Sequence, residues 1–262
     1  MPWHLGPPPL RAALHRLPLC AWRYWPTVGS TNDEALRWLD AGAPEGCLTL
    51  ADEQTQGRGR GARRWWTPPG AALAFSLVVR PLPHEQPHLP RFTAWAAVAL
   101  AETLAHDYGL QPQVKWPNDV LLGGRKVAGV LAEARWEGEH LRGVVVGVGV
   151  NLAPQAVPPA SALDFPATSV AHALGDSPPR WRLLAALLRR MMAWRFRLGS
   201  RAFLQAWEAR LAYRGQMVYA NGHLGRLHGL DNQGRLRLQL PSGAWLTLSA
   251  LQGHLRPAPT KE

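Results

Sequence analysis

The chain has 262 residues, of which 47% are apolar and 18% are charged, and its net charge at neutral pH is +11. The apolar share is enough for one large core, or one large and one small, and it excludes a disordered polyelectrolyte. A strongly positive chain attracts anions of any kind, such as nucleic acid, phosphorylated metabolites or an acidic protein. The charge alone does not choose among these classes.

The cysteines and the N-terminus bear on the compartment. Cys20 and Cys47 are the two cysteines, and they have neither metal-ligand nor redox-motif spacing, which indicates a reducing compartment. Residues 1–22 are interrupted by Pro, Arg and His and have no apolar stretch typical of a signal peptide. No run of about 18 apolar residues is present. These features predict a cytoplasmic protein without a membrane partner.

The N-terminal half is predicted to alternate helices and strands. Residues 1–20 are Pro-rich and are expected to be irregular. Residues 30–42 are expected to form a helix that begins with a capping box of Thr31 and Glu34. The next elements are a strand at 46–52, a buried strand at 72–80 and a helix at 91–109 that Gly109 ends.

A strand-rich block follows residue 112. Residues 113–117 and 119–122 are expected to be short strands, with a hairpin turn at Gly123-Gly124. Residues 126–136 and 140–152 are expected to pair across Glu137-Gly138, and a Pro-rich loop covers 153–166. Residues 180–198 have the pattern of a basic amphipathic helix. Such a helix can lie on a membrane surface, although packing on a core is the commoner case.

The last part of the chain has a different pattern. From about residue 212, short alternating strands are separated by turns about ten residues apart, which is typical of a small β-barrel. The turns are Asn221-Gly222, Asn232-Gln233-Gly234 and Ser242-Gly243. We therefore predict two domains, 1–211 and 212–256.

Residues 54–66, QTQGRGRGARRWW, contain three glycines and four arginines. Glycine lets backbone N–H groups turn toward a ligand, and arginine forks suit phosphate or carboxylate. The stretch is either a lid that closes over a small anion or a flexible, solvated basic loop of the kind seen in nucleic-acid-binding segments. Taken alone, it slightly favours the flexible loop.

Lysine is rare in this chain, since the 29 basic residues include only Lys115, Lys126 and Lys261. In KWPND (115–119), Lys115 can meet a phosphate, Asn118 a ligand and Asp119 a cation, although each is individually more often a turn residue. Lys126 lies in a strand of small and apolar residues, and Gly129 in the same strand indicates a close approach of a ligand or backbone.

Two further motifs are weak by themselves. The glycines of GVGVN (147–151) lack the third glycine and the helix of a dinucleotide-binding fold. Ser30-Thr31-Asn32 forms an ordinary helix start, although helix N-termini also suit a polar ligand. The ten histidines have no HxH or HExxH spacing, so no metal site is predicted, and no P-loop is present.

Taken in order, five motifs resemble those of the biotin–protein ligases. They are STN (30–32), Q-x-x-GRGR-x-x-R-x-W (54–65), KWPND (115–119), RK-x-AG (125–129) and GVGVN (147–151). The resemblance implies an α+β fold: a class II aminoacyl-tRNA synthetase-like mixed sheet flanked by helices, then a small C-terminal SH3-like barrel. Only about 20 residues precede the first expected catalytic strand, so we expect the enzyme without the N-terminal DNA-binding domain of some members.

The resemblance also implies roles for individual residues. Ser30, Thr31 and Gln54 would hold the polar ring of biotin, and the Gly57–Arg60 loop would close over its carboxylate and the α-phosphate. Lys126, Arg58 and Arg60 would be catalytic. The residues expected to bind biotin or the adenylate are Ser30, Thr31, Asn32, Gln54, Gly57, Arg58, Gly59, Arg60, Trp65, Lys115, Asn118, Lys126, Gly129 and Asn151. Arg64 and Trp66 receive no role.

The implied reaction has two steps. Biotin and ATP, brought with Mg²⁺, give biotinyl-5'-AMP, and a lysine of a biotin carboxyl carrier domain then takes the biotin. The expected protein is a monomer or homodimer without a nucleic-acid partner. A lipoate ligase or octanoyltransferase is the related alternative, but the R-x-x-G-G-G motif usual there is absent. A nucleic-acid-binding module would explain the charge, but not KWPND and RK-x-AG on strands.

Overall fold

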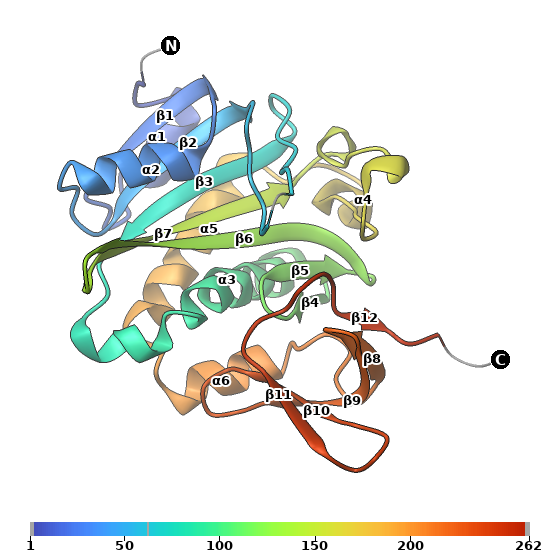
Figure 1. Ribbon diagram of the computed structural model, residues 1–262. Coiled ribbons are helices and arrows are strands. Elements are labelled where there is room, and N and C mark those ends of the chain that lie inside the picture. Colours follow the sequence, from blue (N-terminus) through green and yellow to red (C-terminus); the bar gives the residue numbers. More distant parts are fainter. Residues whose placement is uncertain (1–2, 62, 260–262) are drawn as a thin grey trace.

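A computed structural model describes residues 3–61 and 63–259 of the chain. The large sheet consists of β1 (Ala21–Val28), β2 (Cys47–Gln54), β3 (Ala72–Val79), β4 (Pro112–Lys115), β5 (Asp119–Leu122), β6 (Arg125–Glu137) and β7 (His140–Asn151). Its strand order is β1-β2-β3-β7-β6-β5-β4, with β1 and β2 parallel and the other neighbours antiparallel, so the sheet is mixed (Figure 1).

The small sheet follows near the C-terminus. It consists of β8 (Met217–Ala220), β9 (His223–Leu230), β10 (Leu236–Gln239), β11 (Trp245–Leu248) and β12 (Arg256–Pro257). Its strand order is β11-β10-β9-β8-β12, and its neighbours are antiparallel. The fold is therefore α+β, as the sequence predicted, with one large mixed sheet and one small antiparallel sheet.

Six α-helices accompany the sheets in the described residues. They are α1 (Pro8–Leu14), α2 (Thr31–Asp40), α3 (Arg91–Tyr108), α4 (Val170–Leu174), α5 (Arg180–Trp194) and α6 (Arg201–Glu208). Short 3-10 turns lie at Pro83–His88, Pro154–Ala156, Ala160–Ala162 and Arg195–Arg197. No helix in these described ranges has both the length and the apolar character needed to cross a bilayer.

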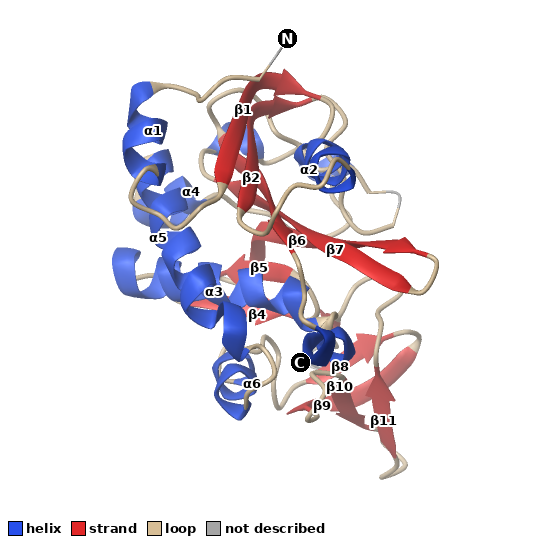
Figure 2. Cartoon of the chain, turned by 90° about the vertical axis from the view of Figure 1, so that its left-hand side faces the viewer, coloured by secondary structure: helices blue, strands red, loops and turns tan. Residues whose placement is uncertain are grey.

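The helices cover the large sheet unequally. α1, α3 and α5 lie on one side of it, and α2 lies on the other side against β2, β3 and β7 (Figure 2). α3 is apolar around most of its circumference, as expected of a helix enclosed between a sheet and other helices. Trp95 on α3 is almost fully buried and donates from Nε1 to the Met191 carbonyl on α5 at 2.7 Å. The main core therefore lies between the sheet and these helices.

The small sheet is joined to the outer edge of the large sheet, at β4. The Val114 N–H donates to the Arg210 carbonyl at 2.7 Å, and the Ala212 N–H donates to the Val114 carbonyl at 2.9 Å. Next to this junction, Trp116 Nε1 donates to the Gly234 carbonyl of the small sheet at 3.0 Å. The residues after β4 are consequently fixed between the two sheets.

Most predicted elements are confirmed, including the helix ending at Gly109, which has a left-handed φ of 66°, and the hairpin at Gly123-Gly124. The prediction that residues 1–20 are irregular is wrong. Residues 8–14 form α1, because proline is tolerated in a first helical turn and the buried Leu10 and Leu14 are one turn apart.

Two helix boundaries also differ from the predictions, and two elements were not predicted. The predicted capping box of Thr31 and Glu34 is wrong. Thr31 is the first residue of α2 and not its N-cap, and its hydroxyl donates to Gln54 Oε1 instead of accepting from a helix N–H. The helix expected over 180–198 ends at Trp194 and continues only as a 3-10 turn. α4 and α6 have no counterpart in the predictions, whereas β1 begins at Ala21, where the family resemblance implied a first strand without giving its end.

Candidate functional site

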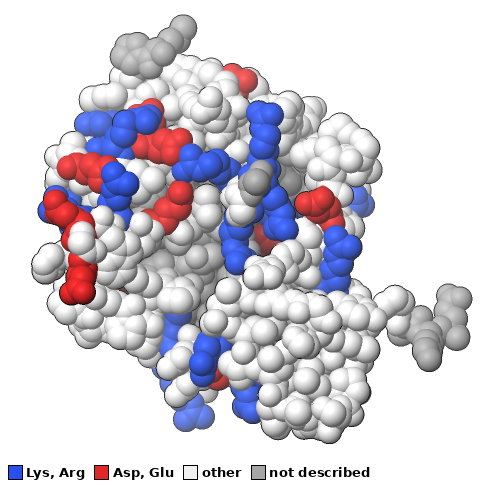
Figure 3. Space-filling model, viewed as in Figure 1, with Lys and Arg blue, Asp and Glu red and all other residues white. Residues whose placement is uncertain are grey.

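The glycine- and arginine-rich residues 54–66 are called the Gly-Arg stretch below. A cavity of about 980 Å³ lies between this stretch, the middle of β6 and β7, and residues 251–254 beside the small sheet. Figure 3 shows Lys and Arg side chains gathered around the hollow on this face. The volume is at the upper end of the range, roughly 300–1,000 Å³, that ligand pockets have in proteins. A basic cavity of this size suits an anionic organic ligand.

The Gly-Arg stretch forms a short hairpin above the cavity. The Trp65 N–H donates to the Gly57 carbonyl, and the Gly59 N–H donates to the Arg63 carbonyl, both at 2.8 Å. A Cβ atom at Gly57 would lie 2.5 Å from the Trp65 carbonyl oxygen, so the close approach of the two arms requires glycine there. The stretch is therefore a folded loop.

Two strand glycines make room for side chains that cross the sheet. A Cβ atom at Gly149 would lie 2.3 Å from the indole of Trp65, and one at Gly147 would lie 2.0 Å from Asn32 Oδ1. Gly129 pairs directly with Gly149 on the neighbouring strand and also faces the Trp65 ring. Gly147 and Gly149 of GVGVN therefore form a flat surface, the glycine floor, against which Asn32 and Trp65 pack.

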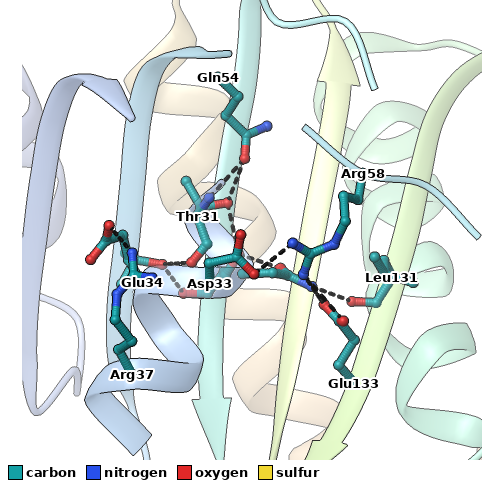
Figure 4. A network of polar contacts seen from close by, with 11 residues as sticks. Thr31, Asp33, Glu34, Arg37, Gln54, Arg58, Leu131 and Glu133 are labelled. Atoms are coloured by element: carbon teal, nitrogen blue, oxygen red, sulfur yellow. Dashed lines mark hydrogen bonds and ion pairs between the residues drawn. The ribbon is translucent and has the colours of Figure 1, made fainter. Parts of the chain in front are cut away.

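A hydrogen-bonded network fixes the polar end of the cavity (Figure 4). Gln54 Oε1 accepts from the Thr31 N–H at 2.8 Å and from its hydroxyl at 3.0 Å, and Gln54 Nε2 donates to Thr67 Oγ1 at 3.1 Å. Asn32 Oδ1 accepts from Ser76 at 2.5 Å, and Asn32 is itself buried. These amides are held in one orientation before any ligand arrives.

Arg58 is bound by two carboxylates. It donates from Nη1 to Asp33 Oδ1 at 2.5 Å and from Nη2 to both Glu133 oxygens at 3.2 Å (Figure 4). The hydrogen bond to Asp33 is the main reason that the pKa of Arg58 is raised. Its guanidinium therefore anchors the hairpin to α2 and β6, and its charge is largely compensated.

Asp119 lies between two lysines. Its carboxylate is 2.6 Å from Lys126 Nζ and 3.0 Å from Lys115 Nζ. Burial opposes its ionisation, but the two lysines outweigh burial and hold the pKa of Asp119 below its usual value. The trio carries a net charge of +1, which is available to an anion in the cavity.

Arg60 adds a further cation on the same side. It donates from Nη1 to Asn118 Oδ1 and from Nη2 to the Leu251 carbonyl, both at 3.3 Å. Burial lowers the pKa of Arg60, but a guanidinium remains protonated at neutral pH. The hairpin therefore reaches both the KWPND turn and the C-terminal part of the chain.

Comparisons with known proteins agree with this site. The family model for the "Biotin/lipoate A/B protein ligase family" matches residues 24–151. The chain is 36% identical over 226 residues to the biotin–[acetyl-CoA-carboxylase] ligase of Paracoccus denitrificans, covering 82% of this chain and 92% of that protein. The chain belongs to the biotin/lipoate A/B protein ligase family.

For two other similar proteins, the match covers different shares of their own length. The bifunctional ligase/repressor BirA of Bacillus spizizenii is 36% identical over 166 residues, and the match covers 63% of this chain but only half of BirA. A biotin protein ligase from Aquifex aeolicus, solved in complex with biotin and ATP, superposes with a TM-score of 0.76 at 25% identity and covers 92% of this chain and all of that chain. The likeness to ligases of this family thus includes both sheets.

The residues that the sequence singled out are brought together in the ligase-family fold. All except Gly57 line the cavity, and Gly57 forms the base of the hairpin above it. Asn151 donates from Nδ2 to the Thr168 carbonyl at 3.0 Å, which attaches the loop after β7. Trp65 packs across the glycine floor, and its Nε1 atom is buried without a hydrogen-bond partner among the described residues.

Several residues of the site were not predicted. Asp33 and Glu133 hold Arg58, and Thr67 and Ser76 hold the two amides. Glu133 carries the one usable signal, since it follows a run of small and apolar residues (127–132) in β6, and a carboxylate in such surroundings needs a cationic partner. Phe165 and His254 also line the cavity, and no sequence pattern marks either of them.

Arg64 and Trp66, which received no role from the sequence, have structural contacts. Arg64 donates to the Thr55 carbonyl at 3.1 Å, and Trp66 donates to the Gln155 carbonyl at 3.1 Å. Both bonds attach the hairpin to neighbouring backbone. Within residues 3–61 and 63–259, no group of three or more His, Cys, Asp or Glu side chains is arranged to hold a metal ion.

Gly149→Ala should damage the site from beneath. The added methyl group would overlap the Trp65 ring, so Trp65 or the strand must shift, and we expect a loss of about 1–3 kcal/mol in stability. Thermal unfolding measures this loss. Gly29→Ala is the control, because its Cβ atom would meet only Gln56 at 3.6 Å. Equal stability of the two variants would contradict the close packing of Trp65 on Gly149.

Proposed function

We propose that this protein is an ATP-dependent ligase that activates biotin as biotinyl-5'-AMP and transfers it to a lysine of a biotin carboxyl carrier domain. The observation that carries the proposal is the cationic trio of Lys126, Asp119 and Lys115, which lies beneath the arginine-containing hairpin. A similar protein, matched over 92% of its own length, is a biotin–[acetyl-CoA-carboxylase] ligase. Joining one anion to another requires positive charge fixed where the two meet, and this cavity supplies it.

We assign the polar end of the cavity to biotin. Ser30, Thr31 and Asn32 are buried there at the start of α2, and Gln54 lies beside them. Because Thr31 and Thr67 fix the Gln54 amide, it needs no reordering when the polar ring of biotin binds. The α2 N-terminus adds N–H groups that favour the ring carbonyl oxygen.

The acidic end of biotin then lies at Lys126. There the biotin carboxylate attacks the α-phosphate of ATP, and pyrophosphate leaves. Lys126, Lys115 and Arg60 stabilise the charge shared by carboxylate and phosphate. Trp65, which lines the cavity, lies toward the adenylate. Mg²⁺ would accompany ATP, since it binds mainly through substrate phosphates and water.

The second step is attack by the carrier lysine on the mixed anhydride, with AMP leaving. The anhydride hydrolyses readily, so the hairpin over the cavity has to exclude water until the carrier arrives. Arg58 serves this purpose indirectly, because its contacts with Asp33 and Glu133 hold the hairpin down. This differs from the sequence prediction, which placed Arg58 at the carboxylate–phosphate junction.

We further propose a division into a class II synthetase-like catalytic domain, 1–211, and an SH3-like domain, 212–256. The beginning of the small sheet at Met217 supports this boundary. Cytoplasmic location, a monomeric or homodimeric state and the absence of a nucleic-acid partner stay predictions.

Exchange of radiolabelled pyrophosphate into ATP tests the activity. We expect exchange that depends on biotin, followed by biotinylation of a carrier domain. The same exchange assay with lipoate in place of biotin distinguishes a biotin ligase from a related lipoate ligase. Exchange with lipoate alone, or strongly salt-dependent DNA binding without any exchange, would reject the proposal.

Arg58→Ala should release the intermediate early. With the hairpin no longer bound to Asp33 and Glu133, biotinyl-AMP would escape and modify exposed lysines of an added bystander protein. Arg64→Ala is the matched control, because it removes an arginine of the same hairpin whose hydrogen bond, within the described part of the chain, goes to a backbone carbonyl. Blotting for biotin on the bystander protein measures the leak. A leak as small as that of the control would exclude an anchoring role for Arg58.

A further inference from the structure

Lys115 is a buried cation whose surroundings come from three parts of the chain. Its side chain is 2% exposed, and its Nζ atom lies 3.0 Å from Asp119 Oδ2. The same atom lies 3.4 Å from the centre of the Phe165 ring and 3.5 Å from His254 Nδ1. An ammonium group has three N–H donors, and Asp119 is already shared with Lys126. The remaining donors therefore depend on Phe165 and His254.

The C-terminal segment, residues 251–256, brings His254 to this position. The His254 ring stacks on Phe165 at 5.6 Å between centroids, with an angle of 29° between the planes. Arg60 of the hairpin donates to the Leu251 carbonyl, and Arg256 donates to the Asp164 carbonyl at 2.5 Å. The segment is thus bound to both loops that border the cavity.

His254 is a neutral acceptor in this environment. Burial is the main cause that lowers the pKa of His254 to about 4, and the charge of Lys115 is the next. Arg63 and Arg256 lower this pKa further, whereas Asp119 raises it. An imidazole that is neutral at pH 7 has one nitrogen free to accept, and the nitrogen beside the Lys115 ammonium takes that role. A cationic histidine at this place would repel Lys115.

We propose that His254 is a positioning residue for adenylation, which accepts from Lys115 through Nδ1 and so holds the ammonium at Asp119 inside the cavity. The active site then needs the C-terminal segment to be complete. The inference rests on the proposed function only for the step that Lys115 assists. The contact between His254 and Lys115 is tested separately.

The scarcity of lysine makes a direct test possible. The whole chain contains Lys115, Lys126 and Lys261, so acylation of lysines by an amine reagent, followed by mass spectrometry of the peptides, reports on each one. We expect little labelling of Lys115 relative to Lys126 in the unaltered protein. His254→Phe keeps an aromatic ring against Phe165 but removes the acceptor, so relative labelling of Lys115 should rise severalfold.

Two further variants separate the acceptor from general disruption. His254→Asn carries an amide oxygen about as far from the backbone as Nδ1, so it should restore low labelling of Lys115. His228→Asn changes an exposed histidine of the small sheet that packs on Trp245, and it should leave labelling unchanged. Melting temperatures are measured first, and His254→Leu replaces His254→Phe if phenylalanine destabilises the fold.

Biotin-dependent pyrophosphate release gives the functional readout. Loss of a hydrogen bond to a charged group predicts a fall of about tenfold or more in kcat for His254→Phe. The KM for biotin should stay unchanged, and His254→Asn should recover most of the rate. A defect that the asparagine does not rescue, or unchanged labelling and rate in His254→Phe, overturns the inference. If the unaltered protein releases no pyrophosphate with biotin, the proposed function fails, while the labelling still decides whether His254 positions Lys115.

Discussion

Replacement of Lys126 by alanine is expected to slow the formation of biotinyl-AMP by roughly 10²–10³-fold, the size of effect seen when one donor to a developing negative charge is removed. Lys126 Nζ is 2.6 Å from Asp119, and the side chain is 24% exposed, so it can reach a ligand in the cavity. Without it, Asp119 is paired only with Lys115, and the trio of net charge +1 becomes neutral. The attacking carboxylate would then meet the phosphate without its nearest cation.

Single-turnover release of pyrophosphate at saturating biotin and ATP measures this change. Arg135→Ala is the matched control, because it removes a basic residue from the same strand. Arg135 is an exposed partner of Asp40 and is not one of the residues that line the cavity. We expect the control to retain activity within about twofold, because an exposed pair contributes about 0–1 kcal/mol. Near-normal pyrophosphate release by Lys126→Ala would remove this residue from the catalytic step.

Asp119→Ala should have the largest effect on stability. It leaves Lys115, which is 2% exposed, and Lys126 as neighbouring cations without their shared anion. Removal of one partner from a buried pair costs about 3–5 kcal/mol, because the remaining charge stays buried. Urea unfolding at pH 7 measures the loss. The depressed pKa of Asp119 means that its stabilisation is present above the unfolded value near 3.8 and is lost only as the pH falls below it.

Two controls sharpen the test of Asp119. Asp40→Ala removes a carboxylate from the exposed pair with Arg135 and should cost about 0–1 kcal/mol. The double variant Lys115→Met, Asp119→Ala removes a buried charge together with its counter-ion, so it should be more stable than Asp119→Ala alone. If the double variant is the less stable of the two, the uncompensated lysine is not the cause of the loss.

The fold was predictable where the pattern along the chain is strong. α3 was predicted almost to the residue, because its apolar residues are continuous and Gly109 ends it. α1 was missed, because prolines around it suggested irregular backbone although its two buried leucines have helical spacing. α6 is short, and a helix of eight residues depends on packing of Phe203 and Trp207 rather than on intrinsic propensity.

The site was predictable at the level of motifs and not of contacts. The sequence placed Lys115, Asn118 and Lys126 among ligand-binding candidates, and all three line one cavity. It assigned Arg58 to the reacting atoms, whereas the structure binds Arg58 to Asp33 and Glu133. Each carboxylate lies on a different element, so no local spacing relates either of them to the hairpin.

By itself, the sequence determined the order of motifs and most of the helices and strands, because helix and strand periods and glycine positions are local properties of the chain. The resemblance of those motifs to the biotin–protein ligases implied the α+β class and the residues that face an anionic ligand. Only the tertiary structure decided which charges compensate one another. Arg58 meets Glu133 across 75 positions and Lys115 meets His254 across 139. Electrostatic interaction depends on distance in space and on burial, and neither follows from separation along the chain.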